Sequence, residues 1–79
     1  MNQLKPTIII IGSEGRIGRA FYSILNESNS FNIICIDPLK KTRDYEVSNN
    51  VLHIKSKLDS LKNAKKILEI IFCENKFLN

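Results

Sequence analysis

Three glycines, Gly12, Gly15 and Gly18, stand three residues apart between a run of isoleucines and a helix-like apolar pattern. In a turn from strand to helix, a first glycine permits the tight turn and a second lets backbone N–H groups approach a pyrophosphate. A third lets the helix pack close to its strand, and the helix N-terminus offers unpaired N–H donors to the phosphates. The spacing therefore predicts a phosphate-binding turn, with a purely structural turn as the alternative. The residues expected to contact a dinucleotide are Gly12, Ser13, Gly15, Arg16, Ile17 and Gly18.

One carboxylate, Asp37, follows the last glycine by about 20 residues, which is the spacing of the dinucleotide-binding pattern. It ends an apolar segment, where its oxygens can accept hydrogen bonds from the hydroxyls of the adenosine ribose. Its charge would also repel a 2′-phosphate, so we expect NAD rather than NADP. The alternatives are that Asp37 is only a turn residue before Pro38, or that nearby cations tolerate the phosphate of NADP. Those cations are Arg16, Lys40, Lys41 and Arg43.

Three apolar segments indicate the strands that would hold these residues. The first, 7–11, is a continuous β-branched run, which suits a parallel strand covered on both faces. The second, 32–37, is also continuous and ends before a proline, and the third, 51–55, alternates in part. Residues 39–50 are polar and lack a strong period, so we expect a loop there, with at most one helical turn.

Two segments repeat apolar residues at helical spacing, which predicts two helices. The first helix is expected over 16–26, before the turn-forming residues 26–30. Its apolar stripe is Ile17, Ala20, Phe21, Ile24 and Leu25. The second helix is expected from Asp59 or Ser60 to about 74, with lysines on its wet side. Its apolar stripe is Leu61, Ala64, Ile67, Leu68, Ile71 and Phe72.

This alternation of strands and helices predicts an α/β chain, namely a partial Rossmann-like fold of three layers with two main helices. Its parallel sheet would have three strands in the order 3-2-1, and residues 76–79 would begin a fourth strand. We therefore expect a single dinucleotide-binding segment over 1–79 that is truncated. The first strand would have a poorly covered apolar edge, which invites association. We expect self-association or pairing with another chain through this edge.

Composition narrows the classes of function that remain. The 79 residues are 43% hydrophobic and 25% charged, which is typical of a globular chain. No apolar stretch approaches the roughly 18 residues of a membrane span, and the N-terminus lacks the features of a signal peptide. We therefore expect a cytoplasmic protein without membrane contact. The net charge is +4, but the lysines are spread and the densest group lies on one helix, so a nucleic-acid partner is not expected.

The cysteine and histidine content does not favour a disulfide or a metal site. Cys35 and Cys73 are far apart in sequence and lie in apolar settings, so we expect two reduced, buried thiols. His53 is the single histidine, and without a Cys/His cluster no metal site is expected.

The segment "IIIIGSEGRIGRAF" resembles the glycine-rich turn of short-chain dehydrogenases/reductases. Its G-x-x-G-x-I-G form is most similar to their extended, epimerase/dehydratase-type branch, which acts on nucleotide sugars. "ICIDP" resembles their second strand with its ribose-binding Asp, and "NNVLHIKSKLDSLKNAKKIL" resembles their third strand, adenine-contacting turn and following helix. The resemblance implies that the chain binds the ADP part of NAD. It places Leu58 at the adenine, after Lys57 where the family usually has Asp.

The resemblance covers about the first third of such an enzyme and ends before its catalytic part. The family's Tyr-x-x-x-Lys is absent, because Tyr22 has Asn26 four residues on and Tyr45 has Asn49. No catalytic role is therefore carried over to any residue here, and we do not expect the chain to be active alone.

Two other functions stay open. "GSEGRIGR" also resembles the turn of dihydrodipicolinate reductases, and "GRAFYSIL" resembles a segment of prephenate dehydrogenases, so another NAD(P)-dependent oxidoreductase is an alternative source of the chain. The second alternative is a non-enzymatic α/β module that binds a protein or nucleic-acid partner through its lysine-rich helix. The lysines concerned are Lys62, Lys65 and Lys66.

Overall fold

The computed structural model describes residues 5–41 and 43–74 of the chain. Six elements follow one another: β1 (Thr7–Ile11), α1 (Arg16–Ser28), β2 (Asn32–Ile36), β3 (Tyr45–Ser48), β4 (Val51–Ile54) and α2 (Leu61–Cys73). The three predicted strands and two predicted helices are all present, close to the expected bounds. The fourth strand expected at 76–79 lies outside the described residues.

The strands form one four-stranded sheet in the order β1-β2-β4-β3. β1 pairs with β2 and β2 pairs with β4 in parallel, so the three predicted strands have the expected neighbours. β3 pairs antiparallel with β4, and the prediction of a loop over 39–50 is therefore wrong in part. The fold is a mixed α/β sheet with two helices rather than a purely parallel one.

The additional strand belongs to a tight hairpin that turns at Asn49 and Asn50. Asn49 has a φ of 53°, a left-handed conformation that asparagine tolerates better than most residues. Every residue of β3 is exposed, and its four residues include no continuous apolar run. Hairpin pairing with β4 rather than burial therefore forms this strand, and a search for apolar runs overlooks it.

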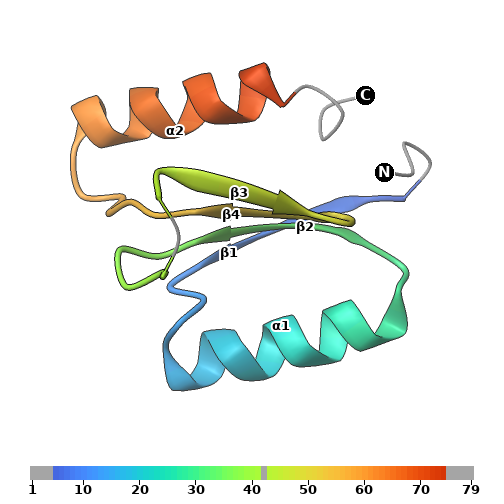
Figure 1. Ribbon diagram of the computed structural model, residues 1–79. Coiled ribbons are helices and arrows are strands. Elements are labelled where there is room, and N and C mark those ends of the chain that lie inside the picture. Colours follow the sequence, from blue (N-terminus) through green and yellow to red (C-terminus); the bar gives the residue numbers. More distant parts are fainter. Residues whose placement is uncertain (1–4, 42, 75–79) are drawn as a thin grey trace.

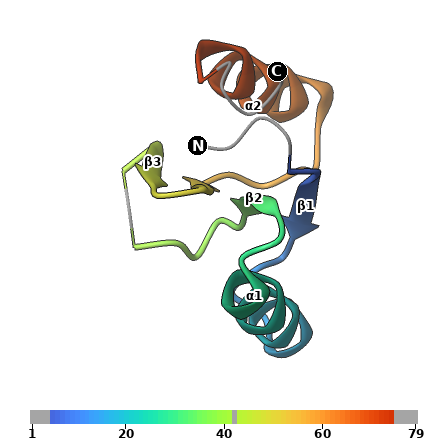
Figure 2. The ribbon, with the colours of Figure 1, turned by 90° about the vertical axis from the view of Figure 1, so that its right-hand side faces the viewer.

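The two helices lie on opposite faces of the sheet, and β1 and β3 lie at its two edges (Figure 2). Because β1, β2 and β4 run in the same direction, their carboxyl ends meet at one end of the sheet, on the left in Figure 1. The glycine turn, the segment after β2 and the segment after β4 all leave the sheet at this end.

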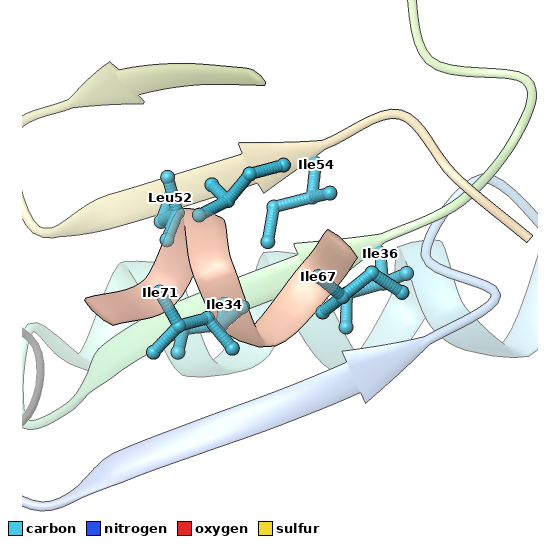
Figure 3. Close-up of a cluster of buried hydrophobic side chains, with 7 residues drawn as sticks. Ile34, Ile36, Leu52, Ile54, Ile67 and Ile71 are labelled. Atoms are coloured by element: carbon cyan, nitrogen blue, oxygen red, sulfur yellow. The ribbon is translucent and has the colours of Figure 1, made fainter. Parts of the chain in front are cut away.

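Two apolar clusters hold the layers together. Towards α2, side chains of β2 and β4 pack against one helix face, as Figure 3 shows; the cluster is Ile34, Ile36, Leu52, Ile54, Ile67, Ile70 and Ile71. Towards α1, the buried residues are Ile10, Ile33, Cys35 and Val51, with Ile8, Tyr22, Leu25 and Phe31 packed against them. β2 is buried along its whole length, as its continuous apolar run predicts.

The structure corrects the expected burial of β1. Only Ile10 of this edge strand is fully buried, so the prediction of a strand covered on both faces is wrong. α1 has no fully buried residue, and Ile17, Phe21 and Ile24 of its predicted stripe are exposed. The physical reason is the narrow sheet, because no described element lies beyond β1 to cover the flank of α1.

The second helix is placed correctly but buries a narrower stripe than predicted. It begins after Ser60, whose hydroxyl accepts the N–H of Asn63 at 3.2 Å and caps the helix. Its buried residues are Ile67, Ile70 and Ile71, whereas the predicted Leu61, Leu68 and Phe72 are exposed. Cys73 at its end is also exposed, so of the two thiols only Cys35 is buried as expected.

Candidate functional site

The turn between β1 and α1 is closed by main-chain hydrogen bonds. Gly12 has a φ of +81°, a conformation that side chains other than glycine rarely adopt. Its N–H donates to the Ile36 carbonyl of β2 at 2.8 Å, and its own carbonyl accepts the N–H of Gly15 at 3.0 Å. The first glycine therefore lets the chain leave the sheet and double back within three residues.

The third glycine is required by close packing. A Cβ on Gly18 would overlap the carbonyl oxygen of Gly12 and lie 2.9 Å from both the Gly12 carbonyl carbon and the Ser13 Cα. A Cβ on Gly15 would lie 3.3 Å from the same carbonyl oxygen, a tight contact but not an overlap. The turn thus needs glycine at Gly18 to form, whereas Gly15 is exposed and a side chain there would require only a small shift of the Gly12 carbonyl.

The first turn of α1 presents its N–H groups without a side-chain cap. Gly15 is the N-cap residue, no side chain caps it, and the first turn holds no acidic residue. The first four N–H groups of a helix have no partner within the helix, and they carry the positive end of the helix dipole. The next residue, Arg16, is exposed and adds a positive charge. This end of α1 is therefore suited to binding an anion.

Asp37 lies directly after β2 and joins two loops. Its Oδ2 accepts the N–H of Glu14 at 3.0 Å, and its Oδ1 accepts the N–H of Leu39 at 2.8 Å. The residue is 5% exposed, so only a small part of it faces solvent. Each carboxylate oxygen has two lone pairs, which leaves acceptor capacity on both. Asp37 therefore holds the glycine turn in place whether or not it also binds a ligand.

Lys40 is a buried cation beside the same turn. It is 8% exposed, and its Nζ donates to Glu14 Oε2 at 3.1 Å and to His53 Nδ1 at 3.0 Å. The Glu14 carboxylate also lies 3.6 Å from the guanidinium of Arg19. The charge of Lys40 is thus paired within the protein, and its side chain is not extended towards solvent.

The Lys40 contact determines the form of His53. Because an ammonium group can only donate, Nδ1 of His53 accepts this bond and the ring is neutral. Burial, and secondly the positive charge of Lys40, lower the pKa of His53. Together with Lys41 and Glu46, these side chains line a polar hollow of about 240 Å³.

Ser13 and Cys35 lie beneath the turn. The Ser13 residue is buried, and among the described residues its hydroxyl, which lies near the Cys35 thiol, has no hydrogen-bond partner. Burial raises the pKa of Cys35, while Lys40 and the Ser13 hydroxyl oppose that rise. The side chain of Ser13 is therefore turned into the protein, and a ligand outside would meet the Ser13 main chain.

Most of the predicted contact residues gather in one region, and Leu58 lies apart from them. Gly12 to Gly15 form the turn, Arg16 to Gly18 begin α1, and the Glu14–Asp37 hydrogen bond connects the turn to Asp37. Ile17 is exposed on α1, as Arg16 is. Leu58 is half-exposed. It belongs to the segment between β4 and α2, and this segment leaves the sheet at the same end as the glycine turn (Figure 1). Sequence reasoning missed Glu14 and the Lys40–His53 contact, for which the sequence carries no local pattern.

Comparison of the chain with protein-family models, with curated proteins and with solved structures found no match. Over residues 5–41 and 43–74, no helix is long and apolar enough to cross a membrane. In the same part of the chain, no group of three or more His, Cys, Asp or Glu side chains is placed to hold a metal ion.

Proposed function

We propose that this chain is the cofactor-binding segment of a Rossmann-like protein of the short-chain dehydrogenase/reductase or epimerase/dehydratase type. It would bind the ADP part of NAD. The observation that carries the proposal is the glycine turn itself, closed on Gly12 and Gly18 at the N-terminus of α1 and hydrogen-bonded to Asp37. A purely structural turn would also use Asp37 to hold the Glu14 main chain, but it would not need a helix end without a side-chain cap.

In this proposal the main chain binds the phosphates. The pyrophosphate would lie against the N–H groups of the first turn of α1, whose dipole favours a negative charge. Gly15 would allow its close approach, and Arg16 would stay near the phosphates. The exposed side chain of Leu58 would border the adenine.

The preference for NAD over NADP rests on two charges. Asp37 would accept ribose hydroxyls through its remaining lone pairs and would repel a 2′-phosphate. Lys40, the buried cation beside it, already bonds Glu14 and His53, so it is poorly placed to neutralise that phosphate. Arg43 and Lys41 are exposed, and they remain the residues through which NADP would be tolerated.

Catalysis is not part of the proposal. The sequence lacks a Tyr-x-x-x-Lys pair, and hydride transfer would need groups from another part of a longer protein or from another chain. The cofactor would supply the redox chemistry, while this chain would bind and orient its ADP end.

The test is a calorimetric titration of the full chain with NADH and NADPH, repeated on Gly15→Leu. Gly15 has a φ of −74° and a ψ of 168°, which a leucine also adopts, and its position is exposed. The leucine should therefore leave the fold intact, as circular dichroism would verify, and block the phosphates. Ser23→Leu, an exposed position further along α1, is the matched control.

We expect NADH binding that Gly15→Leu abolishes and Ser23→Leu preserves. Tighter binding of NADPH would retain the glycine turn but overturn the role of Asp37. A folded chain that binds neither dinucleotide would contradict the proposal and favour the alternative, a module that binds a partner through Lys62, Lys65 and Lys66.

A further inference from the structure

The outer edge of β1 has main-chain groups that face no described strand. The N–H of Gly12 donates to Ile36 at 2.8 Å and the carbonyl of Pro6 accepts from Asn32 at 2.9 Å, so even-numbered residues direct these groups towards β2. Because this direction alternates along a strand, the groups of Ile9 and Ile11 point to the other side. Over residues 5–41 and 43–74, no strand lies there (Figure 2).

The two edges of the sheet differ in their chemistry. The β3 edge is short, carries Glu46 and follows directly on the charged Arg43 and Asp44. Charges and short length are the means by which proteins keep foreign strands from an edge. β1 has neither a charged side chain nor an internal proline, and its register with β2 is continuous, without a bulge. The β1 edge is therefore ready to pair with another strand.

Apolar side chains flank this edge on both faces of the sheet. On the α2 side, Ile9 is 53% exposed and Ile11 is 61% exposed. On the α1 side, Ile17 and Phe21 are exposed, and they line a groove of about 680 Å³ between β1 and α1. A partner that adds a strand here must also offer apolar side chains above and below that strand.

We propose that this partner is a second copy of the chain, whose β1 pairs antiparallel with β1 about a two-fold axis at Ile9. Ile9 then lies opposite Ile9 of the other copy. The outward-pointing main-chain groups of Ile9 meet as a hydrogen-bonded pair. The two four-stranded sheets become one continuous sheet.

The symmetry explains why a second copy fits both flanks. A two-fold axis perpendicular to the sheet keeps each face on its own side, so Ile9 and Ile11 of one copy lie beside those of the other. The two α1 helices come to the same face, where the exposed Ile17 and Phe21 of each copy line the space between them. The same patch is thus used on both copies, as a two-fold interface requires.

Charge and size also favour this occupant. The chain has a net charge of +4, so copies repel over most of their surface, but the segment Thr7–Ile11 is uncharged. A stable interface needs about 800 Å² from each partner. That is a modest share of the 5458 Å² that one copy exposes, and the exposed Ile9, Ile11, Ile17 and Phe21 all lie on this side of the molecule.

The experiment is sedimentation equilibrium on the full chain, compared with Ile9→Lys. A lysine at the centre of the pairing would place two like charges opposite each other. The matched control is Val47→Lys, an exposed position on the opposite edge strand β3. We expect a dimer for the wild type and for Val47→Lys, and a folded monomer for Ile9→Lys.

A cysteine variant tests the register, and it decides the question if Ile9→Lys fails to fold. In a Cys73→Ser background, Ile9→Cys should form an intermolecular disulfide on mild oxidation, because paired Cα atoms in an antiparallel ladder lie within disulfide range. Val47→Cys in the same background should not. A wild type that remains a monomer at all concentrations, or a dimer without Ile9→Cys cross-linking, would overturn the proposal. A monomer would assign the edge to a strand from elsewhere. None of these outcomes depends on cofactor binding.

Discussion

The N–H of Glu14 donates to Oδ2 of Asp37 at 3.0 Å, so the carboxylate after β2 fixes the turn that follows β1. Its second oxygen accepts the N–H of Leu39 and thereby holds the segment after its own strand. The residue that we propose to meet the ribose therefore also shapes the backbone that would meet the phosphates. Effects on stability and on binding have to be separated at this residue.

Asp37→Ala should lower the free energy of unfolding by about 1–3 kcal/mol, because two part-buried N–H groups lose their acceptor. Asp37→Asn retains one acceptor oxygen and should lose less. Urea denaturation followed by circular dichroism measures both. Glu27→Ala, which removes an exposed carboxylate of α1, is the control and should have little effect. Equal stability of Asp37→Ala and wild type would refute the conclusion that Asp37 holds the glycine turn in place.

Gly18→Ala and Gly15→Ala should differ sharply in stability. The new Cβ at Gly18 would overlap the Gly12 main chain, which can yield only if the turn or α1 shifts, so we expect a loss of about 3 kcal/mol or more. At Gly15 the contact is 3.3 Å and the backbone is relaxed, so the loss should stay within about 1 kcal/mol. Thermal unfolding of the two variants side by side measures this difference, and similar melting temperatures would contradict the close packing of Gly18.

The folded protein should become less stable as the pH falls below neutrality because of His53. Burial and Lys40 lower its pKa below the ordinary value of 6.5, so the folded state favours the neutral ring more than the unfolded chain does. The stability from this group is therefore present above pH 6.5 and is lost as the pH falls through the lower pKa of the folded state. His53 is the only histidine, so its ring resonances report the titration directly by NMR.

Lys40→Met is the matched variant for that titration. It removes the cation 3.0 Å from Nδ1, and the pKa of His53 should rise towards its ordinary value. Burial remains in the variant, so the rise should be partial. A wild-type pKa at or above 6.5, or a Lys40→Met variant that does not raise it, would rule out the Lys40 contact as its cause.

The lysines of α2 should not take part in dinucleotide binding. Lys62, Lys65 and Lys66 are exposed on α2, which begins at Leu61, after the Leu58 that we propose to border the adenine. Charge reversal at all three positions should leave the NADH affinity within about twofold of wild type. Fluorescence titration with NADH measures it, and a large loss would move the binding region from the glycine turn to α2.

The apolar pattern predicted most of the elements because they are held by apolar contacts. β2 is buried throughout, and α2 begins at its Ser60 cap. β3 was missed because it is exposed and depends on pairing with β4, although alternating Tyr45 and Val47 before two asparagines could have revealed a hairpin.

The candidate site could also be predicted only in part from the sequence. The roles of Gly12 and Gly18 could be predicted from their spacing, because a strand-to-helix turn is a local structure. The contact of Lys40 with Glu14 and His53 could not, since it joins three separate segments. The position of β1 at the sheet edge could be predicted, because the order 3-2-1 places the first strand at the end of the sheet. The exposure of its faces could not, since a continuous apolar run is typical of a strand covered on both faces.

A residue-resolved NMR titration of the backbone amides with NADH tests directly whether the glycine turn binds the dinucleotide. We expect the largest shifts at Gly12 to Gly18, with smaller shifts near Asp37 and Leu58 and none at the far end of α1. Shifts confined to Lys62, Lys65 and Lys66, or no shifts in a folded chain at millimolar NADH, would contradict this expectation.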